Sequence, residues 1–230
     1  MVDRLRRTRG DTYSWTNLQS DIAGVATHVD PNLVNPWGMA ASSGGTIWVS
    51  DSGTGVSTLY HQDGTAVSLV VTIPTAARNK EGGNPTGVVF NSMQFFKVTL
   101  NGNSQPSLFI FVSEGSSISG WNPQPDSTHA IIAVDNGTNN GSKRAVYKGA
   151  TLGVASGHKG DELWLGNFGD GRINNYDPTT GAFLGTINRA DGTPLQFDNL
   201  WDLLPLGEGV YFTVGIDDEE HGLLGLITED

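Results

Sequence analysis

The sequence predicts an all-β fold, namely a β-propeller of four blades with four antiparallel strands in each. Three observations lead to this prediction. Glycine supplies 31 of the 230 residues and charged residues only 16%, a composition that favours many turns over polar helices. A hairpin pattern recurs four times along the chain. The repeat returns after about fifty residues, a spacing typical of four-stranded propeller blades.

Each repeat contains two short runs of β-branched or aromatic residues around a turn rich in Gly, Ser, Asp or Asn. Such a pattern is typical of two antiparallel strands joined by a tight turn. The four stretches are Thr46–His61, Ser107–Asn122, Glu162–Asp177 and Gly209–Ile227. They predict the second and third strands of every blade.

An apolar run opened by a turn precedes each hairpin: "NPWGMAA", "NPTGVVF", "YKGATLG" and "NLWDLLP". Proline cannot donate to a strand ladder and therefore suits a strand entrance, while glycine lets two backbones approach closely. The innermost strands of a radial array crowd one another, so these runs predict the inner strands. The fourth run has Asp202 where the others have Gly38, Gly87 and Gly149.

The outer strands follow the first three hairpins, at Ala66–Ile73, His129–Asp135 and Gly181–Asn188. The fourth hairpin has no such run after it. We therefore expect the N-terminal run Tyr13–Asp21 to supply the missing strand and to close the ring. The stretch 91–106 predicts an extra hairpin around "LNGN".

A chain of this length can bury a core as one domain. We expect residues 1–12 to form a disordered basic tail and residues 13–230 a single propeller domain. The expected blades span residues 35–73, 84–135, 145–188 and 199–227, the last completed by strand 13–21.

The net charge of −11 argues against nucleic acid and against anionic membrane surfaces as partners. The chain has no cysteine, which excludes disulfides, thiolate metal sites and a cysteine nucleophile. No stretch approaches the roughly 18 apolar residues of a membrane span. The basic start "MVDRLRRTRG" is not followed by an apolar segment, so it does not read as a signal peptide.

Acids and one amide stand where the second strand of each blade is expected to end: Asp51, Glu114, Asn167 and Asp217, or its neighbour Asp218. Asp202 is a further candidate. Hard oxygen ligands of this kind suit Ca²⁺ or Mg²⁺. The alternative, which we favour, is that these side chains cap turns through hydrogen bonds to the backbone.

Trp37 and Trp201 both stand at inner-strand entrances, and they are our candidates for an exposed binding platform. A nucleophilic site is poorly supported, because the sequence has no GxSxG motif and its five histidines are scattered.

Several long stretches resemble an uncharacterised bacterial family of predicted secreted β-propeller proteins, some with exosortase-type sorting tails. They include "TNLQSDIAGVATHVDPNLVNPWGMA", "WVSDSGTGVSTLY", "SEGSSISGWNP", "AVYKG", "GNFGDGRINNYDPTTGAFLG" and "YFTVGIDDEEHGLLG". More distantly, the blades look like the NHL and gluconolactonase superfamily. The resemblance implies export to the cell surface or beyond. It also implies that two blades are missing between "AVYKG" and "GNFGDGR", since family members are longer.

Our first hypothesis is a non-catalytic binding or scaffold propeller that recognises a protein or glycan through one face. The alternative is a Ca²⁺-dependent hydrolase of lactonase type, with Asp51, Glu114 and Asn167 as metal ligands. Asp202 or Asp217 would then be a ligand or base. A third possibility is a structural repeat module of a larger assembly.

Overall fold

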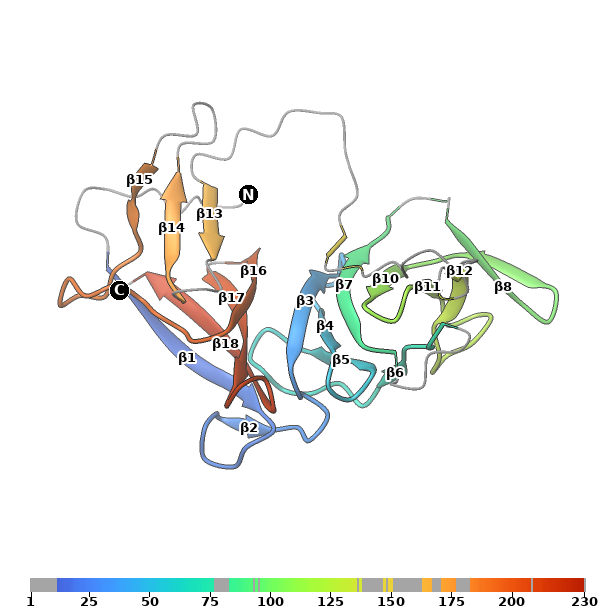
Figure 1. The fold of residues 1–230 in the computed structure, drawn as a ribbon, viewed down its shortest axis with the longest axis horizontal. Helices are drawn as coiled ribbons and strands as arrows, with labels where there is room; N and C mark the ends of the chain where they lie inside the picture. The colour runs from blue at the N-terminus through green and yellow to red at the C-terminus, as the bar shows by residue number, and fades with distance from the viewer. Residues whose placement is uncertain are drawn as a thin grey trace.

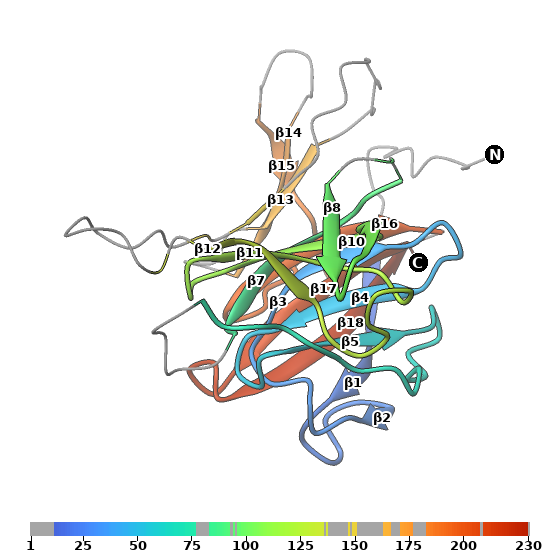
Figure 2. The same ribbon diagram turned by 90° about the vertical axis from the view of Figure 1, so that its right-hand side faces the viewer.

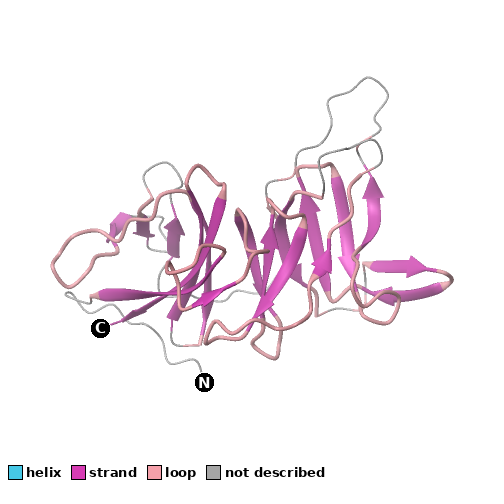
Figure 3. Cartoon of the chain, turned by 90° about the horizontal axis from the view of Figure 1, so that it is seen from below, coloured by secondary structure: helices cyan, strands magenta, loops and turns pink. Residues whose placement is uncertain are grey.

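The computed structural model describes residues 12–76, 83–92, 94, 96–135, 137, 147, 149–150, 163–166, 171–176, 183–207 and 209–229. All regular structure within these ranges is β (Figure 3). Four sheets follow the order of the predicted repeats, and a separate hairpin lies outside them (Figure 1). No helix in the described ranges is long and apolar enough to span a membrane.

The strands of each sheet are as follows. The first sheet contains β3 (Pro36–Ala41), β4 (Ile47–Asp51), β5 (Val56–Tyr60) and β6 (Val71–Thr72). The second contains β7 (Pro85–Phe90), β10 (Phe109–Ser113), β11 (Ser117–Trp121) and β12 (Ile131–Asp135). The third contains β13 (Leu163–Gly166), β14 (Ile173–Tyr176) and β15 (Phe183–Thr186). The fourth contains β16 (Leu200–Leu206), β17 (Gly209–Ile216), β18 (His221–Glu229), β1 (Tyr13–Ser20) and β2 (His28–Val29).

The N-terminal strand lies in the last sheet, where the sequence predicts it. β1 pairs antiparallel with β18, from Tyr13 opposite Glu229 to Ser20 opposite Leu223. A hydrogen bond of 2.6 Å joins Asp21 Oδ2 to His221 Nδ1, just beyond the paired segment. The two ends of the described chain are therefore held in one sheet.

The first described strand of each sheet packs beside that of the next in the order β13, β16, β3, β7, where β16, β3 and β7 are inner strands and β13 belongs to the hairpin of the third sheet. Figure 1 shows β13 and β7 on opposite sides of β16 and β3, and Figure 2 shows the same sheets from the side. The fold is thus propeller-like, since antiparallel sheets stand next to one another through their first strands. Closure of a ring between β7 and β13 stays a prediction.

Three apolar clusters fill the spaces between successive sheets. The one between the third and fourth sheets is centred on Ile173, Phe197 and Phe212. The one between the fourth and first includes Leu224 and Tyr60, and the one between the first and second includes Trp48, Phe109 and Trp121. Within the described residues, these clusters join the four sheets into a row.

The observed strands differ from the predicted ones mainly at the outer edges. β6 has only two residues of the expected Ala66–Ile73 strand. Four of the seven residues of the inner strand predicted at "YKGATLG", and all of the tail 1–12 except residue 12, lie outside the described residues. The extra hairpin is confirmed as β8 (Lys97–Leu100) and β9 (Asn103–Pro106). Its turn has φ of 50° at Asn101 and 82° at Gly102, as a two-residue hairpin turn requires.

Candidate functional site

Three inner strands begin with the same backbone conformation. Asn35, Asn84 and Asn199 have φ of 47°, 40° and 55°, in the left-handed region that asparagine adopts more readily than most residues. Their carbonyl oxygens accept equivalent hydrogen bonds from the backbone N–H groups of Ser52 (3.0 Å), Glu114 (3.1 Å) and Gly215 (3.1 Å). The repeated asparagine therefore marks equivalent positions in the first, second and fourth sheets.

The second and third residues after each of these asparagines line one cavity of about 670 Å³, which we call the inner-strand cavity. Its lining residues are Trp37, Gly38, Met39, Thr86, Gly87, Val88, Gly149, Ala150, Trp201 and Asp202. Positions that are equivalent in the repeat thus converge from three sheets. This is what a propeller-like array does at its centre.

Trp37 and Trp201 stack on each other in this cavity, with ring centroids 3.7 Å apart and an angle of 18° between the planes. Trp37 is only 6% exposed, and its indole Nε1 donates to Asn35 Oδ1 at 3.0 Å. Trp37 is therefore a buried ring stacked on the half-buried Trp201 and not the exposed platform expected for it, and each indole covers one face of the other. Both rings still line the cavity.

Asp202 is the acidic group of the cavity. Its Oδ2 accepts from the Met39 backbone N–H at 2.7 Å and its Oδ1 from the Leu203 N–H at 2.8 Å. Burial raises the pKa of Asp202 to about 6, although both hydrogen bonds act in the opposite direction. The carboxyl group is thus ionised at neutral pH in a site that disfavours its charge.

Thr86 is a lining residue that the sequence analysis missed. It stands where the first and fourth sheets have Trp37 and Trp201, and its Oγ1 donates to the Tyr147 carbonyl at 2.7 Å. Thr86 follows Asn84 by two residues, as Trp37 follows Asn35, so counting from the repeated asparagine would have identified it in the sequence.

Two of the predicted metal ligands, Asp51 and Glu114, do not stand at equivalent positions. The hydrogen bonds to the repeated asparagines make Glu114 equivalent to Ser52 and Gly215, one residue beyond the position of Asp51. Because successive residues of a strand point to opposite faces, side chains one position apart in the repeat do not point the same way. Asn167 lies outside the described residues. In the ranges that are described, no group of three or more His, Asp or Glu residues could hold a metal ion.

Asp51 is instead a buried group between sheets. Its side chain is 0% exposed, and Oδ2 accepts from Thr58 N at 2.9 Å and from Thr58 Oγ1 at 2.8 Å. Its Oδ1 has no hydrogen-bond partner within the described ranges. Burial raises the pKa of Asp51 well above its ordinary value, against the two hydrogen bonds from Thr58.

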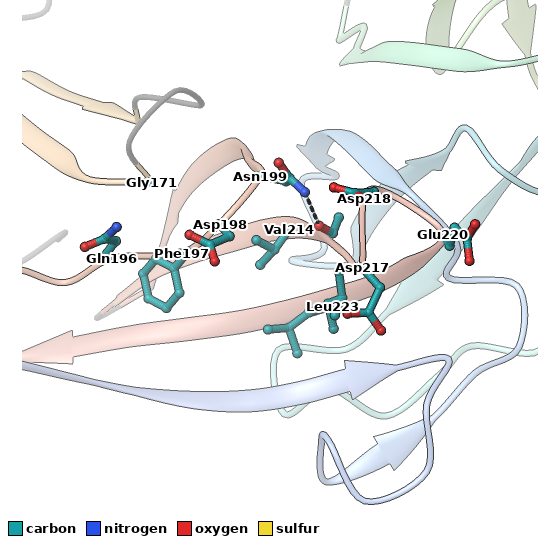
Figure 4. A pocket seen from close by; sticks show the side chains of 12 residues that line it. Gly171, Gln196, Phe197, Asp198, Asn199, Val214, Asp217, Asp218, Glu220 and Leu223 are labelled. Atoms are coloured by element: carbon teal, nitrogen blue, oxygen red, sulfur yellow. Dashed lines mark hydrogen bonds between the residues drawn. The ribbon is translucent and has the colours of Figure 1, made fainter.

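Asp217 lines a second cavity of about 890 Å³ between the third and fourth sheets. Phe197, Val214 and Leu223 contribute apolar surface to it, and Asp198, Asp217, Asp218 and Glu220 contribute carboxylates. Figure 4 shows Asp198 and Glu220 at opposite ends of this cavity. The carboxylates therefore do not converge on one point.

We expect exchange of Ca²⁺ for a chelator to change the melting temperature by less than about 1 °C, because the described carboxylates are dispersed. A cation bound at one hundred times its Kd would raise stability by about 2.7 kcal/mol, which corresponds to several degrees for a chain of this size. Differential scanning calorimetry in Ca²⁺ and in EDTA checks this. A clear rise in Ca²⁺ would contradict it and would make Asn167 the first ligand to replace.

No family model matches the chain. Two uncharacterised proteins of Acanthamoeba polyphaga mimivirus are similar over 198 residues, at 28% and 27% identity, which covers 86% of this chain. The chain spans 45% and 48% of the length of these relatives. The bacterial and secreted character implied by the resemblance therefore stays a prediction.

Among solved structures, the PQQ-bound aldose sugar dehydrogenase of Streptomyces coelicolor has a TM-score of 0.43 at 12% identity, covering 94% of this chain and 98% of its own. A putative 6-phosphogluconolactonase of Bacteroides uniformis has a TM-score of 0.30 at 12% identity, covering 79% and 50%. An inactive virginiamycin B lyase of Staphylococcus aureus has a TM-score of 0.26 at 16% identity, covering 84% and 66%. All three scores lie below 0.5, so the description of the fold rests on this chain's own sheets.

Proposed function

We propose that this chain is a non-catalytic binding protein whose ligand site is the inner-strand cavity. One observation carries the proposal. Equivalent positions of three sheets, two of them tryptophans, converge there around a volume of about 670 Å³. Ligand cavities in proteins are typically about 300–1,000 Å³ and combine apolar or aromatic walls with a few polar groups.

The chemistry of the lining supports binding over hydrolysis. Asp202 is the one titratable side chain among the described lining residues. Acid–base hydrolysis uses a positioned base with a second acid, a nucleophile or a metal ion. The lactonase-type alternative would need such a second group in the same cavity.

The proposal extends to the architecture. We propose that the four sheets are the four predicted blades and that residues near Gly149 supply the inner strand of the third. An exported or cell-surface location is part of the proposal on the strength of the resemblance alone.

The test uses fluorine NMR of the protein labelled with 5-fluorotryptophan, in which each of the six tryptophans gives a signal. Single Trp→Phe variants assign the signals. The probes are cellobiose, benzyl alcohol, benzoate and choline. We expect at least one probe to shift the Trp37 and Trp201 signals saturably while the Trp48 signal stays in place. The proposal is overturned if no probe shifts them.

Trp201→Ala is expected to weaken binding of the best of these probes about 10-fold, a loss of about 1.4 kcal/mol. It removes one indole from the cavity wall and leaves the other without its stacking partner. Trp15→Ala is the matched control, because Trp15 lies on β1, packs against Phe197 and does not line the cavity. Equal affinities of the two variants would contradict the assignment of the site.

A further inference from the structure

We propose that the inner-strand cavity binds an organic cation, with an ammonium group held between the carboxylate of Asp202 and the indoles of Trp37 and Trp201. This inference rests on the proposed function, because it names the ligand class of the same cavity. Three properties of the lining carry it: the sign of its charge, the state of the carboxylate and the aromatic wall.

The charge of the described lining has one sign. Asp202 is acidic and none of the other described lining residues carries a charge. The whole chain has a net charge of −11, so the long-range field also attracts cations and repels anions. An anionic ligand would meet a buried carboxylate with no lysine or arginine from the described lining to offset it.

Among the residues that the structure describes, the carboxylate of Asp202 has no partner of opposite charge. Its two hydrogen bonds come from neutral backbone N–H groups, one from Met39 of β3 and one from Leu203 of β16. The residues that face it from the neighbouring strands are also uncharged, including Thr213, its partner on β17, and Gly38 of β3. Each carboxylate oxygen can accept a further hydrogen bond. A buried ionised carboxylate is costly without a partner of opposite charge, and a bound ammonium group would supply that partner.

The aromatic wall favours a cation over a neutral polar group. The face of an indole attracts a cation placed within about 6 Å of its centroid, and tryptophan is the best of the aromatic residues in this role. Trp37 and Trp201 both line the cavity next to Asp202. A carboxylate beside indoles is an arrangement that suits alkylated ammonium groups, whose surface is partly apolar.

A bare metal ion fits the same cavity poorly. Ca²⁺ takes about six to eight oxygen ligands, and the described lining offers one carboxylate. A neutral sugar could stack on an indole, but it would leave the charge of Asp202 without a partner. An organic cation is therefore the ligand class that fits both the carboxylate of Asp202 and the indole wall.

The experiment compares choline with 3,3-dimethyl-1-butanol, which has the same shape and no charge. Both are titrated into the 5-fluorotryptophan-labelled protein at pH 8, where Asp202 is ionised, and the Trp37 and Trp201 signals are followed. We expect choline to bind at least about 10-fold more tightly, a difference of about 1.4 kcal/mol. Asp202→Asn is expected to abolish this preference. Asp198→Asn removes an exposed carboxylate that lies outside this cavity and should preserve the preference.

Equal binding of choline and its neutral counterpart by the wild-type protein would overturn the inference, and this comparison does not depend on how well any variant folds. A preference that survives in Asp202→Asn would overturn the role of the carboxylate. If cellobiose or benzyl alcohol shifts the two signals but choline has no advantage, only the cation inference fails. If no probe shifts them, the proposed function itself fails.

Discussion

Replacing Gly38 with alanine is expected to destabilise the protein by about 2–3 kcal/mol, the upper part of the range for overpacking. For a chain of this size that corresponds to a fall in melting temperature of roughly 5–10 °C. A Cβ atom at Gly38 would lie 2.6 Å from the Thr86 carbonyl oxygen, 3.0 Å from Gly87 Cα and 3.1 Å from Val88 N. All three are backbone atoms of β7, so β3 and β7 would have to move apart.

Gly87→Ala should have an effect of similar size. A Cβ atom there would lie 2.6 Å from Ala150 N and 2.9 Å from Gly149 Cα. Both substitutions force neighbouring inner segments apart and enlarge the spacing around the inner-strand cavity. Thermal unfolding followed by circular dichroism checks both.

Gly149→Ala is the matched control, because a Cβ atom at Gly149 would meet nothing within 4 Å. We expect its melting temperature to stay within about 2 °C of the wild type. If Gly38→Ala and Gly149→Ala melt alike, the close packing of β3 against β7 is wrong. The three glycines look equivalent in the sequence, and only the structure separates their roles.

The repeat predicts most of the observed strands because the sequence signals of a hairpin lie within the hairpin itself. Alternating apolar residues and glycine-rich turns fix the positions of β4 and β5 or of β10 and β11 without reference to the rest of the chain. The pairing of β1 with β18 follows from counting strands, since the last sheet lacks an outer strand of its own. Outer strands are predicted less well, because few neighbours constrain their length.

The candidate site is only partly predictable. Trp37 and Trp201 stand out at inner-strand entrances and Asp202 as a departure from the repeated glycine, and the structure brings the three into one cavity. The proposed ring of acids depended on a register that the hairpin turns do not preserve. Three residues separate β10 from β11, whereas four separate β4 from β5. A shift of one residue along a strand exchanges its faces, so the sequence pattern alone could not place Asp51 and Glu114.

Asp51→Asn is expected to stabilise the protein at pH 7 by about 1–3 kcal/mol, because it replaces a buried carboxylate that has no partner of opposite charge in the described part of the chain with a neutral side chain. Asp51 is 0% exposed and its Oδ1 has no partner within the described ranges. The amide oxygen of an asparagine can still accept from Thr58 N and Thr58 Oγ1. The substitution therefore removes a buried charge and keeps both hydrogen bonds from Thr58, while the amide Nδ2 takes the place of the unpaired Oδ1.

The effect of Asp51→Asn on stability should depend on pH, and the raised pKa of Asp51 gives the direction of that dependence. Burial raises the pKa of Asp51 in the folded state above the value of about 3.9 expected in the unfolded chain. The folded state then holds the proton more tightly than the unfolded state does. The contribution of Asp51 to the free energy of unfolding is therefore fully present below about pH 4 and is lost as the pH rises through the folded pKa. Asparagine does not titrate. The advantage of Asp51→Asn should vanish near pH 4 and grow as the pH rises toward and through the folded pKa of Asp51.

Urea unfolding of both proteins between pH 4 and pH 8 measures this difference. Asp198→Asn is the control for the general effect of removing one negative charge from a chain of net charge −11, because Asp198 is exposed. It should change stability by less than about 0.5 kcal/mol at every pH. A lower stability of Asp51→Asn than of the wild type at pH 7 would contradict this prediction.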